Sequence, residues 1–171
     1  GPGLGGHCIP LDPYYLSWKA REFGFHTSMI EASMMINDRM PEYTVERAGK
    51  IMNRFQKALN GAKILILGVT YKGDIDDYRE SPAIKVIEEF IKTGAQIEFY
   101  DPHVSEFKHK DLTMAGLNEL EAEKLKSADL VVITTAHSKV DYDFVQRNAI
   151  FVFDTKNAMK DVENRGNIEL L

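Results

Sequence analysis

The residues best suited to chemistry lie at the start of the chain, in Gly1-Pro-Gly-Leu-Gly-Gly-His-Cys-Ile-Pro-Leu-Asp12. Its glycines lead to Cys8, the single cysteine of the sequence, and glycine lets a ligand approach the backbone closely. Asp12 and Pro13 are typical of a helix start, and a helix N-terminus favours a thiolate nearby. We therefore interpret Cys8 as a nucleophile and Asp12 as a helix cap that also handles a proton. The alternative for Cys8 is a small buried apolar residue.

Other roles for this stretch are less well supported. Residues 1–6 fit the dinucleotide pattern G-x-G-x-x-G, but no strand precedes them, and Pro10 and Pro13 prevent an immediate helix. A zinc site at His7 and Cys8 lacks a second pair of ligands at a suitable spacing, so we expect no metal. His7 could also be the base of a thiol hydrolase, but adjacent residues in an extended loop point apart.

The composition indicates a folded chain. Its 171 residues are 44% hydrophobic, which suits one domain of ordinary size with a helical addition. The net charge of −5 offers no basic surface for nucleic acid, and no apolar run approaches the roughly 20 residues of a membrane span. A single cysteine cannot form an internal disulfide, which favours a reducing, cytoplasmic location. Because the chain begins within the glycine-rich motif, we expect a piece of a longer protein, although Gly1-Pro2 could be a tag remnant.

Residues 1–61 form the first expected domain, a cysteine loop followed by helices. One helix is expected over 13–23, with a stop at Gly24. A second helical stretch, 28–59, should kink or restart at Pro41. Its apolar residues recur at helical spacing, and it is rich in methionine. These side chains either pack in a core or form the interface of a homodimer.

From residue 62 onward, apolar runs alternate with helical segments. Helices are expected over 81–93, 117–127 and 142–147; strands are expected over 63–67, 96–100, 129–134, 150–154 and, less clearly, 168–171. Residues 103–116 should be irregular, with a short strand near Leu112. The alternation predicts an α/β fold in which a mainly parallel, Rossmann-like sheet carries helices on both faces. This sheet would form the second domain, residues 62–171.

The ends of the expected parallel strands mark where a ligand should bind. The loops at these ends are 68–80, 101–103, 134–139 and 154–157. Tyr71, Lys72 and Arg79 in the first loop, and Lys156 in the last, are suited to a phosphate-bearing ligand. No G-x-G-x-x-G follows the first strand, so the domain lacks the usual pyrophosphate-binding turn. The alternative for the first loop is a charged segment that is only solvated.

Three segments together resemble one enzyme family. They are the stretch from Gly1 to Asp12, Gly68-Val-Thr-Tyr-Lys-Gly-Asp-Ile-Asp-Asp-Tyr-Arg-Glu-Ser-Pro82, and Phe153-Asp-Thr-Lys-Asn157. In this order and spacing they are similar to the nucleotide-sugar 6-dehydrogenases, which include UDP-glucose, UDP-N-acetylhexosamine and GDP-mannose dehydrogenases. The first segment, with Ser17-Trp-Lys-Ala20, looks most like the UDP-N-acetylglucosamine branch.

The resemblance implies that the chain is the C-terminal part of an NAD-dependent enzyme whose NAD-binding domain lies upstream. Such enzymes oxidise the C6 alcohol of a UDP-sugar to a carboxylate. The reaction proceeds through a thiohemiacetal and then a thioester on the family cysteine, which Cys8 matches. Asp12 would be the carboxylate that assists water or proton transfer. By itself the chain would bind the nucleotide sugar without turning it over.

The resemblance also assigns binding residues and a homodimer through 28–59. The residues expected at the UDP-sugar are Gly1, Gly3, Leu4, Gly5, Tyr71, Lys72 and Lys156, and those expected at NAD are Cys8 and Arg79. The family usually has arginine where this chain has Lys156, which removes a two-pronged contact with the diphosphate. The alternative function is a non-catalytic, dimerising nucleotide-binding module.

Overall fold

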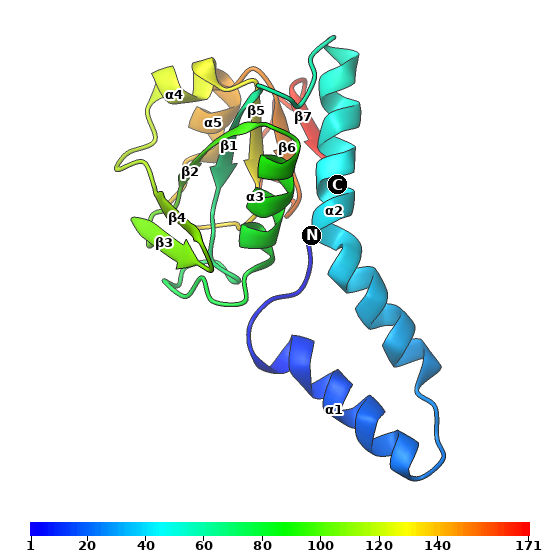
Figure 1. The fold of residues 1–171 in the computed structure, drawn as a ribbon. Coiled ribbons are helices and arrows are strands. Elements are labelled where there is room, and N and C mark those ends of the chain that lie inside the picture. The colour runs from blue at the N-terminus through cyan, green and yellow to red at the C-terminus, as the bar shows by residue number, and fades with distance from the viewer.

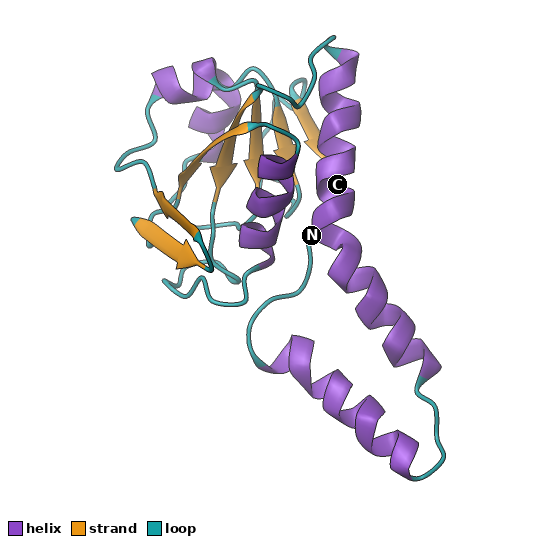
Figure 2. Ribbon diagram, in the orientation of Figure 1, coloured by secondary structure: helices purple, strands orange, loops and turns teal.

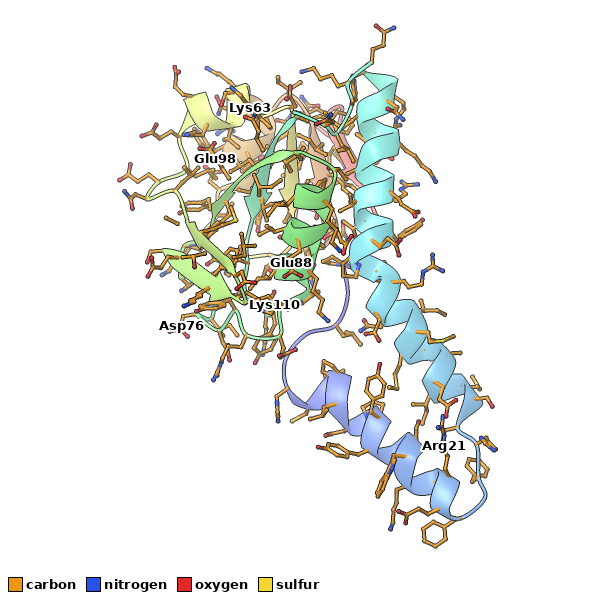
Figure 3. All side chains as sticks on the ribbon, in the orientation of Figure 1. Arg21, Lys63, Asp76, Glu88, Glu98 and Lys110 are labelled. Atoms are coloured by element: carbon orange, nitrogen blue, oxygen red, sulfur yellow. The ribbon has the colours of Figure 1, made fainter.

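Two helices at the start of the chain extend away from a parallel sheet in the computed structural model, which describes residues 1–171 (Figure 1). Helix α1 spans Cys8–Glu22 and helix α2 spans Ser28–Arg54. An ion pair of 2.8 Å between Arg21 and Glu31 joins the two helices at their far end (Figure 3). The second half of α2 runs beside the sheet, so the helices are continuous with the α/β part of the molecule.

Helix α1 begins five residues earlier than the sequence predicts. It starts at Cys8, with His7 as the N-cap, so the prediction of Asp12 as the cap was wrong. Pro10 does not prevent this start, because the first N–H groups of a helix have no intrahelical partner. The predicted stop is confirmed: Gly24 follows the helix with φ +71° and donates to the carbonyl oxygen of Arg21 (3.0 Å).

Helix α2 is continuous through Pro41, so of the two predicted outcomes, a kink or a new start, the structure has the kink. Pro41 lies at its midpoint, and Figure 1 shows that the helix axis bends about midway, as expected where proline removes a backbone hydrogen bond. The helix ends at Arg54 rather than near residue 59, because Gln56 adopts φ +57°. Met52 is buried in the core, as one prediction for the methionines had it, whereas Met29 is 85% exposed and lies outside that core.

The sheet has the order β2-β1-β5-β6-β7, and every neighbouring pair is parallel. The bounds of its strands are β1 Lys63–Leu67, β2 Gln96–Tyr100, β5 Leu130–Ile133, β6 Val152–Asp154 and β7 Ile168–Leu170. The crossover helices are α3 Pro82–Lys92, α4 Ala122–Ser127 and α5 Tyr142–Asn148. The predicted α/β, Rossmann-like fold is confirmed.

Helices cover both faces of the sheet (Figure 2), and alternate residues of the strands supply one core on each face. Ile64 and Ile66 of β1 pack on the face covered by α2 and α3. Leu65 and Leu67 pack on the opposite face with α4 and α5. Strands buried on both faces read as continuous apolar runs, which is why the sequence located them well. Because the second half of α2 shares a core with the sheet, the domain boundary at residue 61 stays a prediction.

The segment expected to be irregular forms an antiparallel hairpin of β3 (Glu106–His109) and β4 (Leu112–Ala115). Phe107 anchors it, since its ring is buried 5.2 Å from the ring of Phe99. Lys110 in the turn has φ +53° and pairs with Glu88 of α3 at 3.3 Å (Figure 3). The helix predicted over 117–127 is shorter, because the segment first extends to donate from the backbone of Leu117 to Phe99 (2.8 Å).

Candidate functional site

The glycine-rich opening loop packs between α2 and the loop that precedes α3. The backbone N–H of Leu4 donates to the side-chain oxygen of Asn37 in α2 (2.7 Å). A Cβ atom on Gly5 would lie 2.7 Å from atoms of both Tyr71 and Pro82, and one on Gly6 would lie 3.1 Å from the Tyr71 ring. Glycine is therefore required at Gly5 by space. The structure brings two predicted parts of the site, the opening loop and Tyr71, into contact.

A second contact links the start of the chain to the end of β6. A Cβ atom on Gly1 would lie 3.5 Å from the Nζ atom of Lys156, so these two predicted binding residues are neighbours. They line a cavity of about 370 Å³ with Asp154, Thr155, Asn157, Leu170 and Leu171. The carboxylate of Asp154 accepts from the backbone N–H groups of Lys156 (2.9 Å) and Met159 (2.8 Å). This arrangement fixes the loop that presents the Lys156 ammonium group.

Cys8 and Asp12 lie one turn apart at the start of α1. Residues at i and i+4 of a helix share a face, with Cβ atoms about 5–6 Å apart. Cys8 is exposed, so the interpretation of it as a buried apolar residue was wrong. It is the first residue of a 15-residue helix, at the positive end of the helix dipole. Asp12 also lines a groove of about 580 Å³ between α1 and α2, together with Leu4 and Asn37.

The loop after β1 presents its cations to solvent. Lys72 is exposed beside the half-buried Tyr71. Arg79 binds the Asp77 carboxylate with two hydrogen bonds of 2.9 Å, and this contact lowers the pKa of Asp77. The side chain of Arg79 is nevertheless 82% exposed, so its guanidinium can exchange Asp77 for another anion.

A buried histidine in the third loop joins the neighbouring loops, and the sequence analysis did not single it out. His137 accepts a hydrogen bond at Nδ1 from the backbone N–H of Asp74 (3.1 Å), and its Nε2 lies 3.0 Å from Oδ2 of Asp101. Because Nδ1 accepts this bond, the ring hydrogen is placed on Nε2, and the Nε2–H group donates a hydrogen bond to Asp101. A histidine four residues after the last residue of β5, in a predicted ligand loop, was the available signal.

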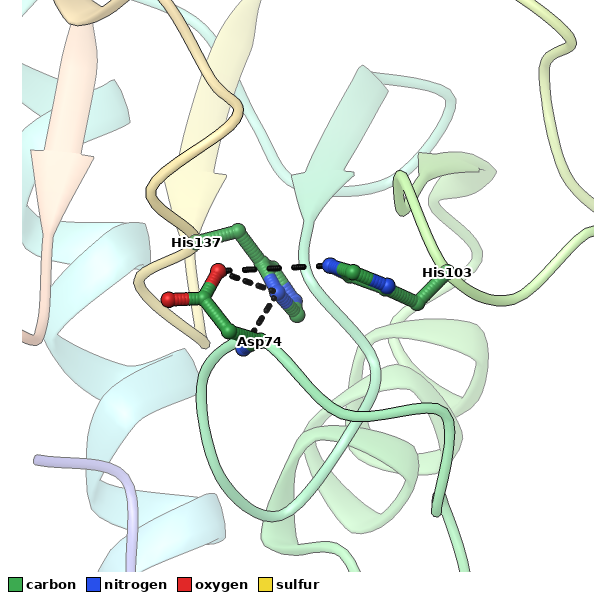
Figure 4. Close-up of side chains that lie close together, drawn as sticks. All are labelled: Asp74, His103 and His137. Atoms are coloured by element: carbon green, nitrogen blue, oxygen red, sulfur yellow. Dashed lines mark hydrogen bonds and ion pairs between the residues drawn. The ribbon is translucent and has the colours of Figure 1, made fainter.

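Asp74, His103 and His137 are the residues best placed to hold a metal ion (Figure 4). One potential ligand atom from each lies within 4.8 Å of the others. Nδ1 of His137 is already bonded to the N–H of Asp74, and Oδ1 of Asp74 accepts from both the backbone (2.8 Å) and the hydroxyl (3.0 Å) of Ser138. These bonds make the cluster a junction between loops.

Two family models match most of the chain. A family model described as "UDP-glucose/GDP-mannose dehydrogenase family, UDP binding domain" matches residues 65–161, and the model of the family's central domain matches residues 1–39. The chain belongs to the UDP-glucose/GDP-mannose dehydrogenase family. The resemblance expected from its motifs is therefore confirmed.

Curated members of the UDP-glucose/GDP-mannose dehydrogenase family match along almost the whole chain. A UDP-N-acetyl-D-mannosamine dehydrogenase of Methanocaldococcus jannaschii is 34% identical over 96% of this chain and 33% of its own length. A UDP-N-acetyl-D-glucosamine 6-dehydrogenase of Pseudomonas aeruginosa is 32% identical over 81% of this chain and 32% of its own length. The chain thus spans about a third of the length of these relatives.

A solved structure supports the same fold. The UDP-D-ManNAc dehydrogenase from Pyrococcus horikoshii superposes with a TM-score of 0.81 at 28% identity, over 99% of this chain and 38% of that one. Within the family match, Cys8 and Asp12 fall in the central domain, whereas Tyr71, Lys72, Arg79 and Lys156 fall in the UDP binding domain. No helix of this chain is both long and apolar enough to cross a membrane.

Asp101, which bonds to His137 of the loop junction, is expected to make this contact sensitive to acid. Burial opposes its charged form, but hydrogen bonds from His137 and from the backbone of Val69 and His103 outweigh burial and lower the pKa of Asp101 below its usual 3.8. A carboxyl whose pKa is lower in the folded than in the unfolded chain stabilises the fold fully at pH values above its unfolded pKa. This stabilisation is lost as the pH falls through the folded pKa.

We expect Asp101→Asn to lower the free energy of unfolding at pH 7 by about 1–3 kcal/mol, because buried donors lose a charged acceptor. The difference from the native chain should shrink below pH 3.8, where the native carboxyl also becomes protonated. Denaturant unfolding from pH 7 to pH 3 measures both effects. Asp111→Asn, at an exposed turn, is the control and should change stability little. A pH-independent difference would contradict the assignment.

Proposed function

We propose that the full-length protein is an NAD-dependent UDP-sugar 6-dehydrogenase, and that this chain supplies its reactive cysteine and its nucleotide-sugar site. The observation that carries the proposal is the packing of the glycine-rich opening loop, which leads to Cys8, on Tyr71, because it brings the central-domain match and the UDP-binding-domain match together. Gly1 beside Lys156 extends this contact along the edge of the sheet. The expected sugar-and-phosphate residues, Gly1, Gly3, Leu4 and Gly5, lie on this loop.

The chemistry assigned to the chain is nucleophilic catalysis by Cys8. The thiolate adds to the C6 carbonyl carbon of the aldehyde produced by the first oxidation, giving a thiohemiacetal. After the second oxidation converts this to a thioester, water attacks the C6 carbonyl carbon, and the C–S bond breaks to release the thiolate and a carboxylic acid, which loses its proton to solvent. Asp12, one helical turn from Cys8, takes the proton from the attacking water.

NAD, when bound, supplies the hydride acceptor for both oxidations. The loop after β1 does not fit its pyrophosphate, because Gly68 and Gly73 lie directly against the backbone of residues 135–136 instead of facing an open turn. The chain offers the exposed guanidinium of Arg79 as a contact for a cofactor phosphate. The main NAD site is therefore proposed to lie outside this chain, with Cys8 and Arg79 facing it.

The proposed substrate is a UDP-N-acetylhexosamine. The printed names of the relatives include both UDP-N-acetyl-D-mannosamine and UDP-N-acetyl-D-glucosamine enzymes, and the motif at Cys8 favours the second. A screen of the full-length protein with both sugars and UDP-glucose, following NADH, identifies the substrate. Exposed Met29, Met35, Ile36 and Tyr43 on α2 support the proposed homodimer, and a cytoplasmic location is proposed from the single free cysteine.

Calorimetry of the 171-residue chain tests the binding part of the proposal. We expect UDP to bind with a Kd of about 1 mM or tighter, and no NADH to form when NAD and a UDP-sugar are added. Lys72→Ala should weaken UDP at least about tenfold, because it removes a charged contact with phosphate. The control Lys110→Ala removes an exposed lysine of the β3–β4 turn and should leave the Kd unchanged. A folded chain without UDP binding would refute the assignment of Lys72.

A further inference from the structure

We propose that His137 is a positioning residue for the UDP-binding loop: its imidazole holds the turn that carries Tyr71 and Lys72, without itself meeting the ligand. The inference rests on the proposed function, since it concerns how that same site is held in shape. The side chain of His137 is fully buried, so it has no surface to offer to a ligand.

The backbone of the UDP-binding loop lies directly against the loop after β5. A Cβ atom on Gly68 would lie 2.5 Å from the carbonyl oxygen of Thr135, and one on Gly73 would collide with the carbonyl oxygen of Ala136. Between these glycines, the hydroxyl of Thr135 donates to the carbonyl oxygen of Thr70 (2.5 Å). The position of the UDP-binding loop is therefore set by residues 134–138.

His137 contributes a bond at the far side of the turn. Its Nδ1 accepts the backbone N–H of Asp74 at 3.1 Å (Figure 4). On the near side, the backbone N–H of Val69 donates to Oδ2 of Asp101 (2.8 Å). The same oxygen lies 3.0 Å from Nε2 of His137. Tyr71 and Lys72 thus lie between two points, Val69 and Asp74, that one His137–Asp101 pair connects.

The imidazole is itself held in place. The backbone N–H of His137 donates to the hydroxyl of Tyr142 (3.0 Å). Burial raises the pKa of Tyr142 to about 12, so that the hydroxyl stays neutral. Asp101 accepts a hydrogen bond from the Nε2–H group and thereby favours the tautomer that leaves Nδ1 free to accept. Asp74 adopts φ +62°, in the left-handed region that few residues other than glycine adopt, and its bonds to His137 and Ser138 hold it there.

Two substitutions at His137 test the contributions of its two ring nitrogens separately. The side-chain oxygen of asparagine can replace Nδ1 as an acceptor, whereas the longer amide of glutamine reaches the Nε2 position. We expect His137→Gln to weaken UDP at least about tenfold and to speed amide exchange at Asp74. We expect His137→Asn to keep the Kd within about threefold of the native value and to keep most of the protection at Asp74. Calorimetry and amide hydrogen exchange by NMR on the chain measure both.

The outcomes divide clearly. An unchanged UDP Kd in His137→Gln, or a weaker Kd with unchanged exchange at Asp74, overturns the inference, and so does an equal loss in both variants, which indicates a merely structural role. If the native chain binds no UDP while the Asp74 amide is protected, the proposed function fails and the loop contact stands. Should neither variant fold, the ¹⁵N spectrum of the native ring decides: Nε2–H with a bare Nδ1 supports the inference, and the other tautomer or an imidazolium at pH 7 overturns it.

Discussion

Replacement of Cys8 with serine is expected to abolish net oxidation of the UDP-sugar by the full-length protein, by at least about a thousandfold in kcat. A serine hydroxyl is a weaker nucleophile than a thiolate and does not form a thioester, so the intermediate that leads to the carboxylate is lost. The measurement is NADH formation with saturating UDP-sugar and NAD. Because Cys8 is exposed at the start of α1, the substitution should leave the fold unchanged.

The binding of UDP is the control for this substitution. It should be the same in the native protein and in Cys8→Ser, since the UDP contacts are assigned to Tyr71, Lys72 and Lys156. Undiminished turnover in Cys8→Ser would instead favour the alternative, a nucleotide-binding module without a catalytic cysteine. Loss of UDP binding together with turnover would mean that Cys8 supports the loop rather than the reaction.

Gly73→Ala is expected to disrupt the ligand loop. A Cβ atom at this position meets the carbonyl oxygen of Ala136, and neither can rotate away, because the Cβ is bonded directly to the Cα and the oxygen is part of the backbone. Overpacking of this kind costs about 1–3 kcal/mol of stability. The loop should move away from residues 134–138, so we expect UDP to bind at least about tenfold more weakly. Denaturant unfolding and calorimetry provide the two measurements.

Gly166→Ala is the matched control for Gly73→Ala. Neither glycine has a positive φ, but a Cβ atom on Gly166 meets only the side chain of Asn164, at 3.5 Å. The same substitution should therefore be neutral, or stabilising by about 0.4–1 kcal/mol through the unfolded chain. If the two variants behave alike, the close approach of the loops around Gly73 does not shape the binding site.

The helical start of Cys8 changes how the reactive pair is understood. Asp12 was predicted to cap a helix that follows the cysteine, but it lies inside a helix that the cysteine begins. The shared helix fixes the separation of the two side chains, which a flexible loop would not do. The same is true of the loop after β5. His137 and Asp101 were predicted only as members of two ligand loops, and the structure shows that they connect those loops.

The parallel sheet, most crossover helices and the family could be predicted from local sequence patterns. Strands buried on both faces must be apolar throughout, and Ser81, Pro82 and Gly94 mark the ends of α3, so these signals are local. The sequence also indicated the candidate residues, because the glycines, Cys8 and Tyr71 stand in recognisable motifs.

The tertiary structure alone decided which of those residues meet. The packing of Gly5 on Tyr71, the approach of Gly1 to Lys156 and the bond from Asp74 to His137 join residues 63–155 positions apart in the chain. Such contacts depend on how the crossover connections position the ends of the strands, and local sequence patterns do not specify those positions. The same holds for the hairpin anchored by Phe107, whose ring packs on Phe99 of β2.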